Sequence, residues 1–214
     1  MSLNNLKTEI AILIKNNDIM TTTERNVITQ TDEITLDNES EIIIDRTNIK
    51  NIRSIVINSV SLVYGKDYTV NYDYLDTNIK CKITLSQNYT DTATVTYDYG
   101  SDKIFTDMAR KDLTLSSYPR ISIEQVSKST ENFSLGGEDF INSEIYQVVV
   151  FSENEEYVED HIKSIETLFK NNAKNLYYAK YIKPTGQGPV IKTPNRSNTI
   201  ISKNIDLMSQ FEVD

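Results

Sequence analysis

The 214-residue sequence is poor in cysteine, histidine, glycine and proline, and it has no tryptophan. Cys81 is the only cysteine, so no internal disulfide forms and no set of thiolate metal ligands exists. His161 is the only histidine, and no nucleophile stands in the type of turn that a Ser-His-Asp or Cys-His arrangement needs. The six glycines form no Walker-type or Rossmann loop, and HExxH is missing. We therefore expect no enzyme activity, no cofactor and no metal site.

Long hydrophobic runs and excess positive charge are also missing. The longest apolar run near the N-terminus covers residues 10–14, too short to cross about 30 Å of hydrocarbon or to act as a signal peptide. The formal charge of −9 argues against general nucleic-acid binding, which depends on Lys and Arg at phosphates. With 38% hydrophobic and 25% charged residues, the composition is ordinary for a folded chain. We expect a soluble protein of one large or two small domains that contacts no membrane.

Residues 18–100 follow a period of two, which predicts β-strands. Thr, Val, Ile and Tyr dominate this region, as half-buried strands prefer. In residues 68–74, Tyr68, Val70 and Tyr72 share one face and polar side chains occupy the other. The predicted strands cover residues 26–30, 41–45, 53–58, 61–64, 68–74, 80–86 and 93–99. Antiparallel strands with one wet face predict a small sandwich or curled sheet.

Two segments have the period of an amphipathic helix. Residues 2–16 place Leu6, Ile10 and Ile14 on one stripe, with Ser2 as a candidate N-cap. Residues 153–171 carry the clearest stripe of the chain, formed by Val158, Ile162, Ile165 and Phe169. Ser152 and Glu155 have the spacing of a capping box.

The remaining C-terminal segments predict a second, mixed structure. Strands are expected at 121–126, 144–151, 176–182, 199–201 and 205–213, with a long loop at 184–197. This order predicts a small antiparallel or mixed sheet with helix 153–171 on one face. The N-terminal helix also needs an apolar surface, and the same sheet face is the best candidate. We therefore predict an α+β fold in which residues 1–17 plus 104–214 form one domain and residues 18–103 form an inserted all-β, sandwich-like domain.

Two segments and one cluster are candidate contact sites. Loop 184–197 is long for so small a domain, so it is either disordered or an arm that docks on a neighbouring subunit. Its candidate interface residues are Lys183, Pro184, Gly186, Gly188, Pro189, Lys192 and Arg196, and the polar stretch 127–142 is a second candidate arm. Arg120 suits a carboxylate across a subunit boundary or within its own chain. The acids Glu155, Glu156, Glu159 and Asp160 either line a lumen or a subunit contact, or form a solvated helix face.

The order of these parts resembles the tail-terminator and neck proteins of tailed bacterial or archaeal viruses. The resemblance rests on Pro119 and Arg120 opening the strand at 118–123, on the strand at 146–151, on helix residues Ile162 and Leu168, and on the last strand, 205–211. An N-terminal amphipathic helix is also usual in this family. Residues 63–70 and 95–100 are similar to β modules of viral structural proteins.

The resemblance implies a non-catalytic virion protein. Such proteins form a ring, usually hexameric, that is assembled in the host cytoplasm, caps the tail tube and joins it to the head connector. Genome DNA passes through the ring without specific binding, and an acidic lumen would repel phosphate. The implied partners are further copies of the chain, the tail tube protein and the neck proteins.

Two other functions stay open at this point. The first is a β-sandwich adaptor of a viral baseplate or fibre, which contacts a host-surface sugar or another tail protein. The second is an enzyme that acts through paired carboxylates, although no nucleophile, base or metal set converges in the sequence.

Overall fold

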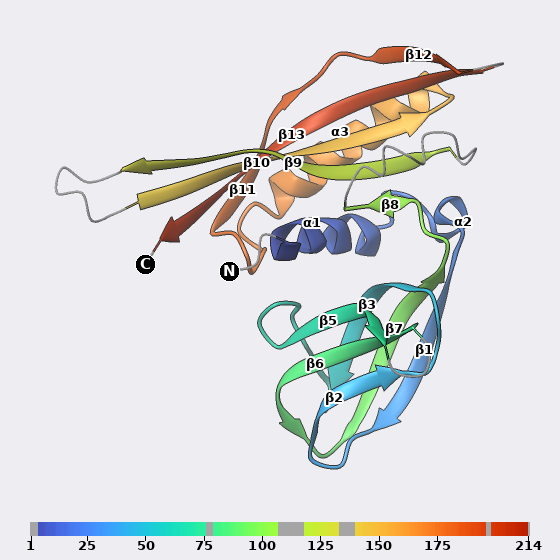
Figure 1. Ribbon diagram of the computed structural model, residues 1–214, viewed down its shortest axis with the longest axis vertical. Coiled ribbons are helices and arrows are strands. Elements are labelled where there is room, and N and C mark those ends of the chain that lie inside the picture. Colours follow the sequence, from blue (N-terminus) through green and yellow to red (C-terminus); the bar gives the residue numbers. More distant parts are fainter. Residues whose placement is uncertain (1–3, 76–78, 107–117, 133–139, 196–197, 214) are drawn as a thin grey trace. The chain divides into compact units, whose positions relative to one another are not determined.

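The computed structural model describes residues 4–75, 79–106, 118–132, 140–195 and 198–213. The fold is α+β, with far more strand than helix. The chain divides into two compact units (Figure 1): unit 1 is Met1–Met20 with Lys103–Asp214, and unit 2 is Thr21–Asp102. The N-terminal boundary therefore follows Met20 rather than residue 17, and the second boundary precedes Lys103 rather than residue 104.

Unit 1 contains a six-stranded sheet in the order β11-β13-β10-β9-β8, with β12 also paired to β13. The strands are β8 (Ile104–Phe105), β9 (Arg120–Asn132), β10 (Phe140–Ser152), β11 (Tyr181–Gln187), β12 (Ile191–Asn195) and β13 (Asn198–Val213). β8 runs parallel to β9, and the other pairs are antiparallel, so the sheet is mixed. β13 is one continuous strand, not the two segments predicted at 199–201 and 205–213.

One face of this sheet is covered by helices α1 (Asn4–Asn16) and α3 (Glu155–Asn171). The side chains on that face alternate along each strand with those on the open face, and they form a dry core with the helices. They are Ile121, Ile123, Tyr146, Val148, Val150, Ile205 and Leu207. α3 packs on β10, β11 and β13, whereas α1 packs on β8 and β9. The predicted position of the N-terminal helix, beside helix 153–171 on one sheet face, is confirmed.

The predicted apolar stripe of α3 is also confirmed, but its cap is not. Val158, Ile162, Ile165 and Phe169 are fully buried. The N-cap is Asn154, whose Oδ1 accepts hydrogen bonds from the amides of Glu156 and Tyr157. Ser152 lies further back in β10, where its hydroxyl accepts from the Asn154 amide at 3.2 Å. Ser152 was therefore the wrong choice, because strand β10 continues to that residue. The predicted N-cap of α1, Ser2, lies outside the described residues.

The C-terminal parts of unit 1 differ most from expectation. The strand predicted at 176–182 begins only at Tyr181, because Leu176, Tyr178 and Ala179 are buried in an irregular segment instead. The stretch 127–142, predicted as an arm, is paired strand over its described residues, with β9 and β10 in register from Ser127 opposite Ile145 to Asn132 opposite Phe140. The outer ends of β9, β10 and β13 form a ribbon that extends past α1 and α3 at the left of Figure 1.

Unit 2 is a two-sheet sandwich preceded by the short helix α2 (Thr22–Arg25). One sheet has the order β1-β7-β3-β4 and the other β2-β6-β5. The strands are β1 (Val27–Thr35), β2 (Glu39–Ile44), β3 (Ile49–Ile57), β4 (Val60–Ser61), β5 (Tyr68–Leu75), β6 (Ile79–Tyr89) and β7 (Thr92–Gly100). A single core joins the sheets, including Ile42, Ile55, Ile83 and Val95. The predicted strand at 61–64 is reduced to β4, which is two residues long.

Candidate interaction surfaces

Among the described residues, the first edge of the unit 1 sheet is paired only at its beginning. β8 pairs only with Ile121 and Ser122 of β9. The Ile121 amide points to this edge, because it donates to the Lys103 carbonyl at 2.9 Å. Backbone groups alternate along a strand, so the Ile123 amide faces the Phe105 end of the ladder to β8, and the Gln125 amide points outward beyond the end of β8. This edge therefore presents main-chain donors and acceptors that a second strand can pair with.

The opposite edge is formed by β11 and β12, and it corrects the prediction for 184–197. Those residues are not a free arm: Lys183, Pro184 and Gly186 lie in β11, and Lys192 lies in β12. Gly188 and Pro189 connect the two strands, and Arg196 lies outside the described residues. The prediction of a long loop failed because three prolines and two glycines in these residues are typical of loops, whereas edge strands tolerate both residue types.

Gly188 is held tightly against β13. Its amide donates to the Asn204 carbonyl at 3.0 Å. A Cβ at this position would lie 2.0 Å from Asn204 Oδ1, so only glycine permits this close approach without a shift of Asn204. The segment between β11 and β12 is thus a specific part of the sheet edge.

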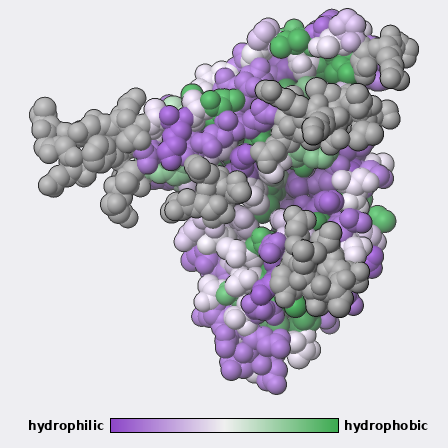
Figure 2. Space-filling view, in the orientation of Figure 1, coloured by the Kyte–Doolittle hydropathy of each residue, from purple (hydrophilic) through white to green (hydrophobic). Residues whose placement is uncertain are grey.

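Large apolar side chains are exposed along both edges. On the first edge, Phe105 of β8 is 40% exposed and Val126 of β9 is 49% exposed. On the second, Ile191 of β12 is 52% exposed. Val126 is the extra residue of a β-bulge between Gln125 and Ser127, which turns its side chain out of the regular alternation. On the face drawn in Figure 2, hydrophobic residues form small separate patches among hydrophilic ones.

Arg120 contacts aromatic rings of its own unit. Its guanidinium carbon lies 5.2 Å from the ring centroid of Tyr118 and 5.1 Å from that of Phe151. Cation–π contacts of this length hold the side chain over the open face of the sheet. These ring contacts differ from the carboxylate pair that the sequence suggested, and the role of Arg120 in a subunit contact stays a prediction.

The acids predicted on α3 are largely neutralised within unit 1. Glu155 Oε2 lies 2.6 Å from Lys192 Nζ, and Glu159 Oε2 lies 2.7 Å from Lys203 Nζ. Asp160 lies 3.8 Å from Lys163, while Glu156 is exposed at the first turn. Surface pairs of this kind contribute about 0–1 kcal/mol each, so their main effect is to lower the net negative charge of this face.

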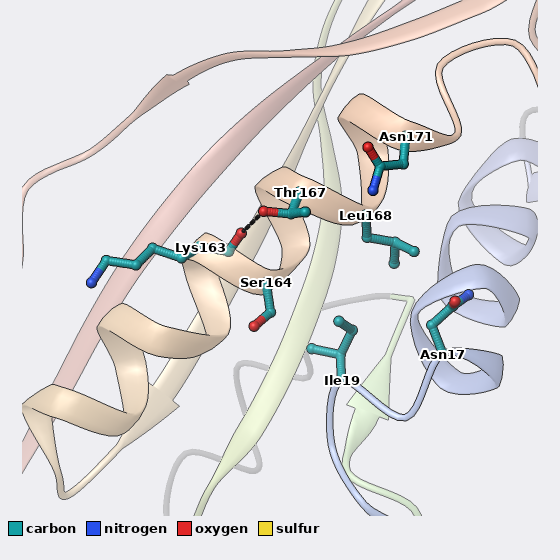
Figure 3. A pocket seen from close by; sticks show the side chains of 7 residues that line it. All are labelled: Asn17, Ile19, Lys163, Ser164, Thr167, Leu168 and Asn171. Atoms are coloured by element: carbon teal, nitrogen blue, oxygen red, sulfur yellow. Dashed lines mark hydrogen bonds between the residues drawn. The ribbon is translucent and has the colours of Figure 1, made fainter.

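A hollow of about 380 Å³ lies between the end of α1 and α3 (Figure 3). Ile19 and Leu168 point into it from the two sides. The full lining is Asn17, Ile19, Lys163, Ser164, Thr167, Leu168 and Asn171. Asn17 Nδ2 donates to the Leu13 carbonyl and Thr167 Oγ1 to the Lys163 carbonyl, each at 2.9 Å. These groups complete helix hydrogen bonds and do not converge on a common point, so the hollow has no arrangement for catalysis.

Glu9 connects α1 to the irregular segment after α3. Its Oε1 accepts from the Tyr177 amide at 2.6 Å, and its Oε2 accepts from the Tyr178 amide at 3.0 Å. Burial raises the pKa of the Glu9 carboxyl, although both hydrogen bonds act in the opposite direction. No sequence pattern reveals this contact, since the partners are main-chain groups far along the chain.

Unit 2 contains a buried ionic network close to its first and last residues. Arg25 is fully buried, and its Nη1 lies 2.9 Å from Asp98 Oδ2. Its Nε lies 3.0 Å from Asp102 Oδ1. Asp98 Oδ1 also accepts from Arg53 Nε at 2.6 Å and from the Thr29 hydroxyl at 2.7 Å.

The charges of this network balance each other. Burial alone would raise the pKa of Asp98, but hydrogen bonds from Arg53 and Thr29 and the charge of Arg25 lower it overall. Asp98 is therefore an anion held by two cations, as a buried charge must be. This network was not predicted from the sequence. The one local signal near Arg25 is the capping box formed by Thr21 and Glu24, which begins the short helix α2 that contains Arg25.

The single cysteine and the single histidine of the sequence both take part in packing. Cys81 is fully buried in the unit 2 core, and burial raises the pKa of its thiol to about 12. The ring of His161 stacks on Tyr157 at a centroid distance of 3.7 Å. His161 Nδ1 also lies 2.8 Å from the Tyr157 carbonyl oxygen.

Two further kinds of feature are absent from the described residues. No group of three or more His, Cys, Asp or Glu residues within the described ranges is placed to hold a metal ion. No helix among these residues has the length and apolar character needed to cross a membrane. Comparison of the chain with known protein families gives no matching family, and comparison with curated proteins gives no significant match.

Proposed function

We propose that the chain is a non-enzymatic virion subunit that assembles into a closed ring at the neck end of a viral tail. The order of elements that resembles tail-terminator and neck proteins motivates this proposal. In such a ring, usually of six copies, the subunit caps the tail tube and joins it to the head connector. Unit 1 supplies the ring body, and the β-sandwich of unit 2 is an insertion into it.

The observation that carries the proposal is the pair of unlike, unpaired edges on the unit 1 sheet. One edge offers the outward main-chain groups of β9 with Phe105 and Val126 beside them. The other offers β11 and β12 with the exposed Ile191. Two different surfaces on opposite sides of one subunit are what a heterologous contact needs, and such contacts generate closed rings. Strand pairing across the edges would satisfy the main-chain groups.

The overall charge is compatible with passage of DNA. At −9, the chain carries an excess of carboxylates, and a lumen lined by carboxylates repels phosphate and leaves DNA free to slide. The α3 acids are mostly paired within unit 1, so the open sheet face is the better candidate for this role. Glu124 and Asp206 lie on that face, at positions facing Gln147 of β10.

The test uses a proline on the free edge of β9. Gln125→Pro removes an outward amide while leaving the pairing with β10 intact, and Gln125→Ala is its matched control. We expect the unmodified protein and Gln125→Ala to form one discrete oligomer by mass photometry, alone or with the tail tube protein. We expect Gln125→Pro to remain monomeric with an unchanged circular dichroism spectrum. A wild-type chain that stays monomeric under both conditions contradicts the proposal.

A second candidate function, the β-sandwich adaptor of a baseplate or fibre, is favoured by one observation. Unit 2 has a groove of about 530 Å³ beside two edge strands, β1 and β2. Such an adaptor would contact a host-surface sugar or another tail protein through unit 2. Binding of the monomer to defined sugars on a glycan array would support this function over ring assembly.

A further inference from the structure

The sandwich of unit 2 is open along strand β1. The residues of β7 that face the core opposite β1, Ala93, Val95 and Tyr97, are fully buried. Their partners on the same face of β1 are partly or largely exposed: Ile34, Asp32 and Gln30 are half-buried, and Ile28 beyond them is 60% exposed. The second sheet therefore covers β7 but does not reach over β1. Solvent therefore reaches the core face of the sheet at Ile28 and Ile34.

Along this side, no strand in the described part of the chain pairs with the main-chain groups of β1. β1 is the end strand of its sheet and pairs only with β7. The Ser101 amide donates to the Asn26 carbonyl at 3.2 Å, and the Leu36 amide donates to the Asp91 carbonyl at 3.0 Å. These bonds show that even-numbered residues of β1 bond to β7, so the odd-numbered Thr29, Thr31 and Glu33 direct their amides and carbonyls outward. An extended segment can pair with them in register.

A groove continues from this edge. It is lined by Ile34 of β1, by residues 38–43, and by Asn88 of β6. β2, which supplies most of the lining, is the end strand of the second sheet. Ile43 of β2 is 42% exposed beside it. The groove thus has an edge strand of each sheet beside it and apolar side chains in its wall.

The charge around this groove is negative. Residues 21–102 contain 13 acidic and 7 basic side chains. Within the described part of the chain, Glu33, Asp37 and Glu39 form no ion pair with a basic residue. Asp32 accepts from the Tyr97 hydroxyl at 2.6 Å and from Gln30 at 2.7 Å, and these bonds lower the pKa of its carboxyl. Acidic side chains are therefore concentrated around this groove.

The geometry points to a binding site on β1 for an extended segment of a partner protein in which apolar and basic residues alternate. Its main chain would pair with Thr29, Thr31 and Glu33. Its apolar side chains would cover Ile28 and Ile34, and its basic side chains would lie near the unpaired carboxylates. A second copy of this chain fits less well, because two acidic sandwiches would bring their carboxylates together. This site is independent of ring assembly by unit 1.

The experiment uses the full chain and two labelled peptides of nine residues, the length of β1. One peptide alternates lysine and valine, and the other alternates glutamate and valine. We expect the lysine peptide to bind at least about tenfold more tightly by fluorescence anisotropy, with weaker binding at higher salt. Equal binding of the two peptides, or no binding of the lysine peptide, would overturn the proposal.

Two variants test whether the peptide lies on β1. Thr31→Pro removes one outward amide without breaking the ladder to β7, and we expect it to weaken lysine-peptide binding at least about tenfold. Thr31→Ala keeps the amide and should change binding less than about twofold. Unchanged circular dichroism and melting temperature in both variants show that folding is intact. Equal effects of the two variants, or peptide-independent self-association that Thr31→Pro abolishes, would contradict the proposed partner.

Discussion

Replacement of Arg25 by methionine tests the buried network of unit 2. Methionine retains much of the apolar length of the side chain but removes the cation that contacts Asp98 and Asp102. Removing one member of a buried ion pair leaves an uncompensated charge, which costs about 3–5 kcal/mol. Because Arg53 still holds Asp98, we expect a loss at the lower end of that range, about 3 kcal/mol.

A loss of this size is large for unit 2. At about 0.05–0.15 kcal/mol per residue, a unit of this length has a total stability of about 4–12 kcal/mol. A change of 1 kcal/mol shifts the melting temperature of a domain this small by about 4–8 °C. We therefore expect the unit 2 transition to fall by about 12–24 °C in Arg25→Met.

The assay is thermal unfolding of the full chain by far-ultraviolet circular dichroism, with hydrogen exchange of β1 and β7 peptides to assign the transition to unit 2. The effect should depend on pH. In the wild type, the pKa of Asp98 is lower in the folded than in the unfolded protein. Asp98 therefore stabilises the fold at pH values above its unfolded pKa, and this stabilisation is lost as the pH falls through its folded pKa. Without Arg25 the folded pKa of Asp98 rises, so the difference between variant and wild type should shrink as pH falls from neutral toward about 4.

Two results would refute this reasoning. One is a loss of less than about 1 kcal/mol, which is the size expected of a surface pair. The other is a difference that stays constant over the pH range, because Asp98 with only one of its two cations should take up a proton at a higher pH than in the wild type. The double variant Arg25→Met/Asp102→Asn should lose less stability than the two single variants lose together, because the Arg25 and Asp102 side chains interact directly.

The remaining predictions concern unit 1 and the thiol of unit 2. Glu9→Ala leaves two amides without acceptors and should cost about 1–3 kcal/mol in chemical denaturation. The loss of stability in Glu9→Ala should be smaller at neutral than at acidic pH. The raised pKa of Glu9 means that its ionised form stabilises the fold less than its protonated form does. Asn154→Ala should cost about 1 kcal/mol and Ser152→Ala clearly less, as measured by thermal melts. Cys81 should react with a thiol reagent only at the rate of unfolding.

Local patterns in the sequence were sufficient to predict the elements whose apolar side chains all face one large core. The stripe of α3 and the alternation at 68–74 and 93–99 each repeat an apolar residue at the period of one structure, so they predicted both the element and its buried face. The division into a helical unit with an inserted β unit followed from the change of period near residues 18 and 103. Strand ends were placed less well, because pairing extends a strand into polar residues, as at 127–132 of β9.

Tertiary structure alone decided where edges, charges and main-chain groups lie. Residues 184–195 read as a loop, yet they are β11 and β12 because β13 offers them a long partner strand. Arg25 and Asp98 are distant in sequence, and only the pairing of β1 with β7 brings them together. The open side of β1 follows from the order of strands in the two sheets, although the polar Gln30 and Asp32 on its core face agree with it. A periodic pattern reports which side chains prefer burial, whereas the partner that buries them depends on contacts between residues far apart in the chain.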